Sequence, residues 1–241
     1  MSRASTPRRI ALTSVALSII ARSRATRARD AFEAFQGKSS AQIAFERPVS
    51  WTTAIDRDLD RRVVPVGGKT VSLVGNFRSV DTVAVRVERA GGGAREAAAR
   101  GDAAGVADAL TANERDAVRA LEAVGVVGGV ENGRTGTMGF ELLDDARTRV
   151  DERGRRYFTY AYETEVCRGN IEEEGLGGAR VCVGPKGDYL DVIKRKNLVV
   201  CTFWDDAVVK LHASAVSSRF DEPEVNEIMR RAADSFALIV A

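Results

Sequence analysis

Histidine is nearly absent from this chain, which has one imidazole among 241 residues. This scarcity excludes zinc and iron sites that need two or more histidine ligands, and it leaves little scope for histidine base catalysis. Three cysteines are too few for a small scaffold built from disulfides. No run of 18 apolar residues occurs, so the sequence predicts no transmembrane helix. The length suffices to bury one core, and we expect one domain with extensions.

Acidic residues are missing from the first 29 residues, which contain seven arginines. Subtracting these seven charges from the formal net charge of +2 leaves −5 for the other 212 residues. The remainder of the chain therefore has no net positive field. We expect no nucleic-acid partner for it.

The N-terminal segment has the pattern of an export signal. Arg8-Arg9 is followed by a short apolar stretch, Ile10 to Ile20, and the pair resembles a twin-arginine signal. Small residues around Ala28 suit a cleavage site there. The arginine-rich, acid-free composition also suits an organellar transit peptide. A buried N-terminal helix or a disordered arm is the alternative.

Composition also suggests the domain boundaries. We assign residues 1–40 to a targeting leader with its linker and residues 41–241 to the folded domain, and we expect the mature chain to begin between about Ala25 and Gln42. Within the domain, residues 167–196 are rich in glycine and charge. This composition predicts an insert between two pairs of strands.

The folded part alternates apolar and polar residues over short segments, which predicts strands. The expected strands cover residues 71–74, 82–88, 139–150, 155–166, 197–204 and 207–216. The Ala/Gly segment 90–105 predicts a flexible connection. A capping box, Thr111 to Glu114, predicts a helix to about Val124, and Pro223 opens an amphipathic C-terminal helix capped by Asp221 and Glu224. Strands grouped together, with helices at their flanks, predict an α+β fold.

Several of these segments, in this order, resemble the PsbP family of thylakoid-lumen proteins. The matching segments are Phe45 to Trp51, Gly75 to Phe77, Arg153 to Phe158 with Tyr160 and Tyr162, Val209 to Ala215, Arg219-Phe220 and Asp234 to Phe236. The resemblance implies a central antiparallel β-sheet flanked by helices on both faces, an α-β-α sandwich that is also typical of Mog1-like proteins.

The resemblance also implies a function and a compartment. It indicates a non-catalytic extrinsic protein of the chloroplast thylakoid lumen, peripherally associated with the membrane and bound to lumenal subunits of photosystem II or photosystem I. The insert indicates a paralogue with an assembly or stabilisation role. The alternatives are a redox-regulated lumenal factor, an unrecognised enzyme that uses the cysteine-bearing insert, and, more distantly, a Mog1-like GTPase-binding protein, against which the export leader argues.

The cysteines support a specific hypothesis for this compartment. An oxidising lumen permits a disulfide, and Cys167 and Cys182 are the candidates because the glycines between them let the chain turn back. Cys201 alternates with Val199 and Phe203 on an expected core face, so we expect a buried free thiol. Three unpaired thiols are the alternative.

Lys194, Arg195 and Lys196 form the densest basic cluster of the folded part and are the candidate docking site. Docking by charge would weaken as salt shortens the Debye length from about 10 Å at 0.1 M to about 3 Å at 1 M. A solvated turn is the alternative. No cofactor is predicted; Asp205-Asp206 is the calcium candidate, since the family is associated with calcium, and a solvated hairpin tip is the alternative.

Two sharper motifs are excluded. Gly67-Gly68-Lys69-Thr70 has the end of a phosphate-binding loop, but its first glycine is missing and a strand is expected to follow where the motif needs a helix. His212 shares the polar face of its strand with Lys210 and Ser214. We therefore expect a surface histidine and no general base.

Overall fold

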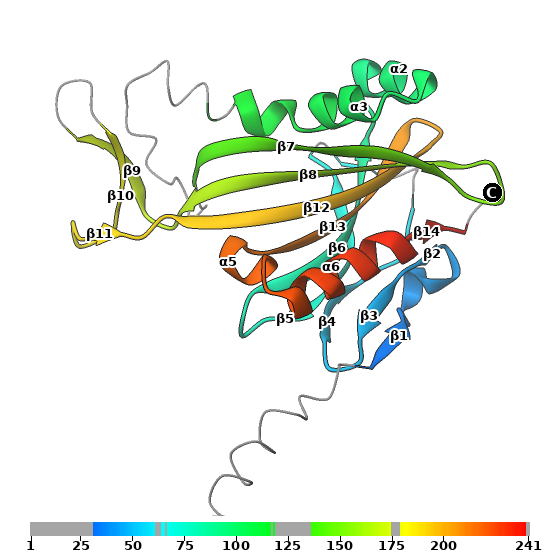
Figure 1. The fold of residues 1–241 in the computed structure, drawn as a ribbon, viewed down its shortest axis with the longest axis horizontal. Coiled ribbons are helices and arrows are strands. Elements are labelled where there is room, and N and C mark those ends of the chain that lie inside the picture. The colour runs from blue at the N-terminus through cyan, green and yellow to red at the C-terminus, as the bar shows by residue number, and fades with distance from the viewer. Residues whose placement is uncertain are drawn as a thin grey trace, which may run out of the picture. The chain divides into compact units, whose positions relative to one another are not determined.

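A seven-stranded antiparallel sheet forms the centre of the computed structural model (Figure 1), which describes residues 31–60, 64–65, 67–116, 118, 136–174 and 179–239. The strand order across the sheet is β4-β5-β6-β13-β12-β8-β7, and every neighbouring pair is antiparallel. The strands span Thr52–Asp56 (β4), Lys69–Asn76 (β5), Asp81–Arg89 (β6), Gly136–Val150 (β7), Arg156–Cys167 (β8), Ile193–Trp204 (β12) and Ala207–Val216 (β13).

The folded part of the chain begins before residue 41, the boundary that we predicted from the sequence. β1 (Phe32–Ala34) pairs with β3 (Glu46–Pro48), and Phe35 is buried and stacks on Phe45 at 4.8 Å between ring centroids. Between them lie the 3-10 helix η1 (Lys38–Ala41) and β2 (Ile43–Ala44), which pairs with β14 (Ala237–Leu238). The compact unit therefore starts at Phe32. The twin-arginine segment lies outside the described residues.

One face of the sheet packs on the C-terminal helices. Alternate residues of β6 and β13, including Val83, Val85 and Leu211, are buried against α5 (Ser217–Phe220) and α6 (Pro223–Ser235). The apolar stripe of α6 is buried as expected, because residues three and four apart share one helix face. The capping expectation is wrong: Glu222 holds the N-cap position without a side-chain hydrogen bond, and Asp221 instead accepts from Lys196.

The opposite face is covered by α2 (Gly92–Arg100) and α3 (Ala103–Leu110), as Figure 1 shows. Segment 90–105 is therefore a helical hairpin and not the flexible connection that we expected. Alanine has the highest helix propensity, and Gly101 ends α2 with a left-handed φ of 74°. Helices on both faces of an antiparallel sheet confirm the α+β sandwich.

Thr111 begins a helical segment over residues 112–116, but the capping box is only half correct. The Thr111 carbonyl accepts from the Arg115 N–H, as a helix start requires, while its hydroxyl donates to the Ala107 carbonyl of α3. The expected helix end near Val124 lies outside the described residues.

The insert contains a small antiparallel sheet of its own, in the order β11-β10-β9. Its strands span Asn170–Glu174 (β9), Ala179–Val183 (β10) and Tyr189–Leu190 (β11). β12 then begins at Ile193, earlier than the expected 197. None of the helices in the described ranges has the length and hydropathy that a bilayer span needs.

Candidate functional site

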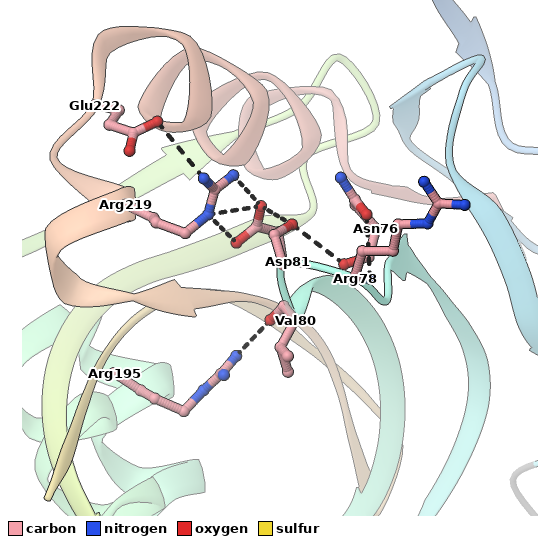
Figure 2. A network of polar contacts seen from close by, with 8 residues as sticks. Asn76, Arg78, Val80, Asp81, Arg195, Arg219 and Glu222 are labelled. Carbon is pink, nitrogen blue, oxygen red and sulfur yellow. Dashed lines mark hydrogen bonds and ion pairs between the residues drawn. The ribbon is translucent and has the colours of Figure 1, made fainter. Parts of the chain in front are cut away.

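The turn that joins β5 to β6 forms a tightly held tip at one end of the sheet (Figure 2). The Asn76 side-chain carbonyl accepts from the Arg78 backbone N–H, and the Ser79 hydroxyl donates to the Asp81 carboxylate at 2.5 Å. Val80 has a φ of 60°. A β-branched residue rarely adopts this left-handed conformation and is held there only by its surroundings.

Arg219 of α5 holds this tip by an ion pair. Its guanidinium, presented by α5, donates to both oxygens of Asp81, the shortest contact being 2.7 Å, and lies 3.8 Å from Glu222. Asp81 is only 2% exposed. The hydrogen bond to Asp81 raises the pKa of Arg219 above its ordinary value. The ion pair links two segments that lie 138 residues apart in the sequence.

Arg195 of β12 makes the second attachment. Its guanidinium donates to the Val80 carbonyl at 3.0 Å (Figure 2). It also donates to the Ser214 hydroxyl at 2.9 Å. Burial lowers the pKa of Arg195. The turn is thus hydrogen-bonded to both α5 and the middle of the sheet, so its backbone is ordered before any partner arrives.

Two apolar side chains protrude from this ordered turn. Phe77 is 44% exposed and Val80 is 38% exposed, with the exposed Arg78 between them in the chain. An apolar side chain on an ordered backbone is suited to enter a pocket on another protein, since little backbone entropy is lost on binding. The four residues Phe77, Val80, Asp81 and Arg219 are called the hairpin tip below.

The predicted docking cluster lies next to the hairpin tip, in a strand and not in the solvated turn that was the alternative. Lys194, Arg195 and Lys196 are residues of β12 and do not form a turn. Lys194 Nζ lies 2.8 Å from Glu165, and Lys196 Nζ lies 3.0 Å from Asp221. Each cation of the cluster therefore has a partner within the chain, and the cluster adds little net positive charge to the surface.

Sequence reasoning did not select the hairpin tip as a site. The segments Gly75 to Phe77 and Arg219-Phe220 were visible only as parts of a family resemblance. Their contact depends on β6 and β13 being neighbours in the sheet. No local signal in the sequence indicates that neighbourhood.

Cys167 and Cys182 form a disulfide in the structure, with their Cα atoms 5.5 Å apart. They lie in a small core with Met138 and Ile171, and both are buried. A reductant would reach this disulfide only after local opening of the insert. Cys201 is a buried free thiol, and burial raises its pKa to about 12.

His212 is not the surface residue that we expected. The parity argument was correct, because His212 lies on the face opposite to Leu211, but the ring is half-buried in a cavity between the sheet and the segment that follows α3. The imidazole Nε2 lies 3.1 Å from the Asn197 side-chain carbonyl and 3.2 Å from the Tyr162 hydroxyl. Burial, and next the charge of Lys210, lower the pKa of His212 to about 3, so the ring is neutral at ordinary pH.

The structure also places the glycine motif at Gly67-Gly68 and the calcium candidate at Asp205-Asp206. Gly67 and Gly68 form a turn before β5, which is a strand, so the exclusion of a phosphate-binding loop is confirmed. Asp205-Asp206 lies in the turn between β12 and β13. Within the described part of the chain, no group of three or more His, Cys, Asp or Glu side chains is placed to hold a metal ion. Calcium stays a prediction from the resemblance.

Comparison with known proteins finds similar structures but no similar sequence family. No family model and no curated protein matches the chain. The solution structure of cyanobacterial PsbP (CyanoP) from Synechocystis sp. PCC 6803 is similar with a TM-score of 0.44 and 14% identity, over 87% of this chain and 93% of that one. The crystal structure of the Saccharomyces cerevisiae Ran-binding protein Mog1p has a TM-score of 0.41 and 14% identity, over 87% and 96%. Both TM-scores lie below 0.5, so the fold assignment rests on the strand order and helix positions themselves.

Proposed function

We propose that this chain is a non-catalytic extrinsic protein of the thylakoid lumen that docks onto lumenal subunits of a photosystem, with photosystem II as the first candidate. Its role would be that of an oxygen-evolving-complex-like subunit or of an assembly and stabilisation factor. The proposal rests mainly on the structure of the hairpin tip. Two of the segments that resemble the PsbP family, one with Phe77 and one with Arg219, meet there around an ordered and exposed apolar turn.

Two further observations support the compartment. The basic, acid-free leader favours export. The disulfide Cys167–Cys182 is typical of proteins that fold in an oxidising compartment. Processing of the leader has to leave Phe32 in place, because β1 pairs with β3 and belongs to the folded unit.

The docking contact that we propose is mainly apolar. Phe77 and Val80 would enter a pocket on the partner, and Arg78, which makes no ion pair within the described residues, would meet an acidic group at the rim of that pocket. The cations of the cluster at Lys194 and Lys196 already face Glu165 and Asp221. We therefore expect high salt to weaken docking only in part, because screening acts on charge and leaves apolar burial in place.

Co-fractionation tests the partner. Thylakoid membranes from cells that produce the protein are solubilised gently, the complexes are separated under native conditions, and the chain is detected by antibody. Comigration with photosystem II or photosystem I supports the proposal. Migration with neither, together with absence from washed membranes at low salt, contradicts it.

Rebinding to stripped membranes tests the surface. Phe77→Ser should lower affinity about tenfold, since a central aromatic contact is typically worth 1–2 kcal/mol. Val150→Ser is the matched control, because Val150 is 59% exposed in β7 at the opposite end of the sheet. Lys194→Gln combined with Lys196→Gln tests the basic cluster separately. Equal rebinding by Phe77→Ser and wild type would remove the hairpin tip from the interface.

A further inference from the structure

A cavity of about 460 Å³ lies between the sheet and the segment that follows α3. Its floor is formed by side chains of four adjacent strands, β6, β13, β12 and β8, and Leu110 to Glu114 form a wall. The residues that carry the argument are Arg86, Glu88, Tyr160, Tyr162, Lys210 and His212. This volume lies within the range of about 300–1,000 Å³ that small-molecule sites occupy.

The floor of this cavity is unusually polar for the interior face of a sheet. Under α2 and α3 the same face is apolar, with Phe158, Cys201 and Val208 buried together. Polar groups in such a place cost free energy unless they are paired. Breaks in an otherwise apolar pattern are expected at functional sites.

Two cations face each other directly across the β6–β13 pair in this floor. Arg86 and Lys210 are register partners, an arrangement that is destabilising by itself. Glu88 lies between them, 2.5 Å from Lys210 Nζ and 3.3 Å from Arg86 Nε. Because Glu88 is one carboxylate beside two cations, this group of three side chains has a net charge of +1. Arg89 and Glu114, which also line the cavity, add one charge of each sign and leave this excess unchanged.

Two cations of this floor, Arg86 and Lys210, also act on the imidazole of His212. After burial, the groups that lower its pKa are Lys210, Arg86 and Arg195, all of them cations. The ring is neutral, so it adds no charge of its own. A positive potential in a partly enclosed cavity favours an anion.

The loop before β5 contacts Glu88 and Arg86 of the floor directly. Gly68 has a φ of 82°, and a Cβ at this position would lie 2.4 Å from Cγ of Glu88, so the backbone is pressed directly against that side chain. Arg86 donates to the Gly67 carbonyl at 3.1 Å. These contacts orient the guanidinium before any ligand arrives, as a built site requires.

We propose that this cavity binds a small organic carboxylate, with the carboxylate group held by Arg86 and Lys210 and the remaining atoms lying against Tyr162 and His212. The chemistry that recognises the ligand is a charge-assisted, bidentate contact from the arginine. The proposal does not depend on the docking function, because the cavity and the hairpin tip share no residue.

The single histidine of the chain makes the test specific. Its imidazole gives one set of ring signals in an NMR spectrum, and that set belongs to the cavity. We would titrate the full chain with benzoate and, separately, with benzamide, which has the same shape but no charge. Benzoate should shift the His212 ring signals saturably, and benzamide should bind at least tenfold more weakly. Unmoved ring signals, or equal shifts with both probes, would overturn the proposal.

Variants then test the contact. Arg86→Gln should weaken benzoate binding at least tenfold, and Lys210→Gln should also weaken it, while Arg100→Gln, at an exposed arginine outside the cavity, should bind as wild type does. Chemical-shift dispersion shows whether each variant is folded. If Arg86→Gln does not fold, Lys210→Gln decides. Wild-type affinity in a folded Arg86→Gln or Lys210→Gln variant would overturn the assignment.

Discussion

Removing the two partners of the Asp81–Arg219 ion pair should have unequal effects on stability. Asp81 is 2% exposed, whereas the Arg219 side chain is 36% exposed. Arg219→Gln leaves a buried carboxylate with the Ser79 hydroxyl as its remaining side-chain donor. Asp81→Asn leaves a guanidinium that water can still reach. The first variant therefore retains the more poorly solvated charge.

The expected magnitudes follow from this difference in burial. Breaking a fully buried ion pair costs about 3–5 kcal/mol. Because one partner here is partly exposed, we expect Arg219→Gln to lower the free energy of unfolding by about 3 kcal/mol and Asp81→Asn by about 2 kcal/mol. The double variant should lose less than the sum of the two, since neither charge is then left alone.

Urea unfolding of the four proteins, followed by circular dichroism, measures these differences as a double-mutant cycle. Lys196→Gln is the control, because the Lys196–Asp221 pair is more exposed and should contribute less than about 1 kcal/mol. A larger loss for Asp81→Asn than for Arg219→Gln would refute the argument from burial. Strictly additive effects would show that the pair is not coupled.

Three further predictions concern the thiols, the histidine and the leader. Thiol counting on denatured, unreduced protein should find one free thiol, that of Cys201, and three would exclude the disulfide. The two bonded cysteines are 15 positions apart in the sequence, so reduction should cost about 3 kcal/mol. The pKa of His212 is about 3 in the fold against an ordinary 6.5, so the unfolded chain binds the proton first and stability should fall as pH drops below about 6.5. The slope from this one group is at most about 1.4 kcal/mol per pH unit, and His212→Gln, measured by urea unfolding between pH 7 and 5, should flatten it. N-terminal sequencing of the native protein should find a start at or before Phe32; an intact Met1 would contradict the lumenal assignment, and a later start would contradict the role of β1.

Features with a local physical cause could be predicted from the sequence. The alternation over residues 207–216 predicted β13 with the bounds that the structure has. The stripe on α6 was predicted because helix periodicity is set by the backbone alone. The prediction of a flexible connection over residues 90–105 was wrong because it gave the glycines more importance than the alanines. The glycines lie at the N-terminal end of α2, where they destabilise a helix little.

The charge pattern of the sequence was sufficient to separate the basic first 29 residues from an acidic remainder. The alternation of residues was sufficient to assign strands and the face on which each side chain lies. The tertiary structure alone decided which faces are covered. Strand parity placed His212 opposite Leu211, but only the tertiary structure brought the segment after α3 over that part of the face and enclosed the ring in a cavity. Likewise, the ion pair of Asp81 with Arg219, and the register pairing of Arg86 with Lys210, depend on β6 lying beside β13. Pairing between distant strands depends on the whole chain collapsing around one core, and no short window of residues contains that information.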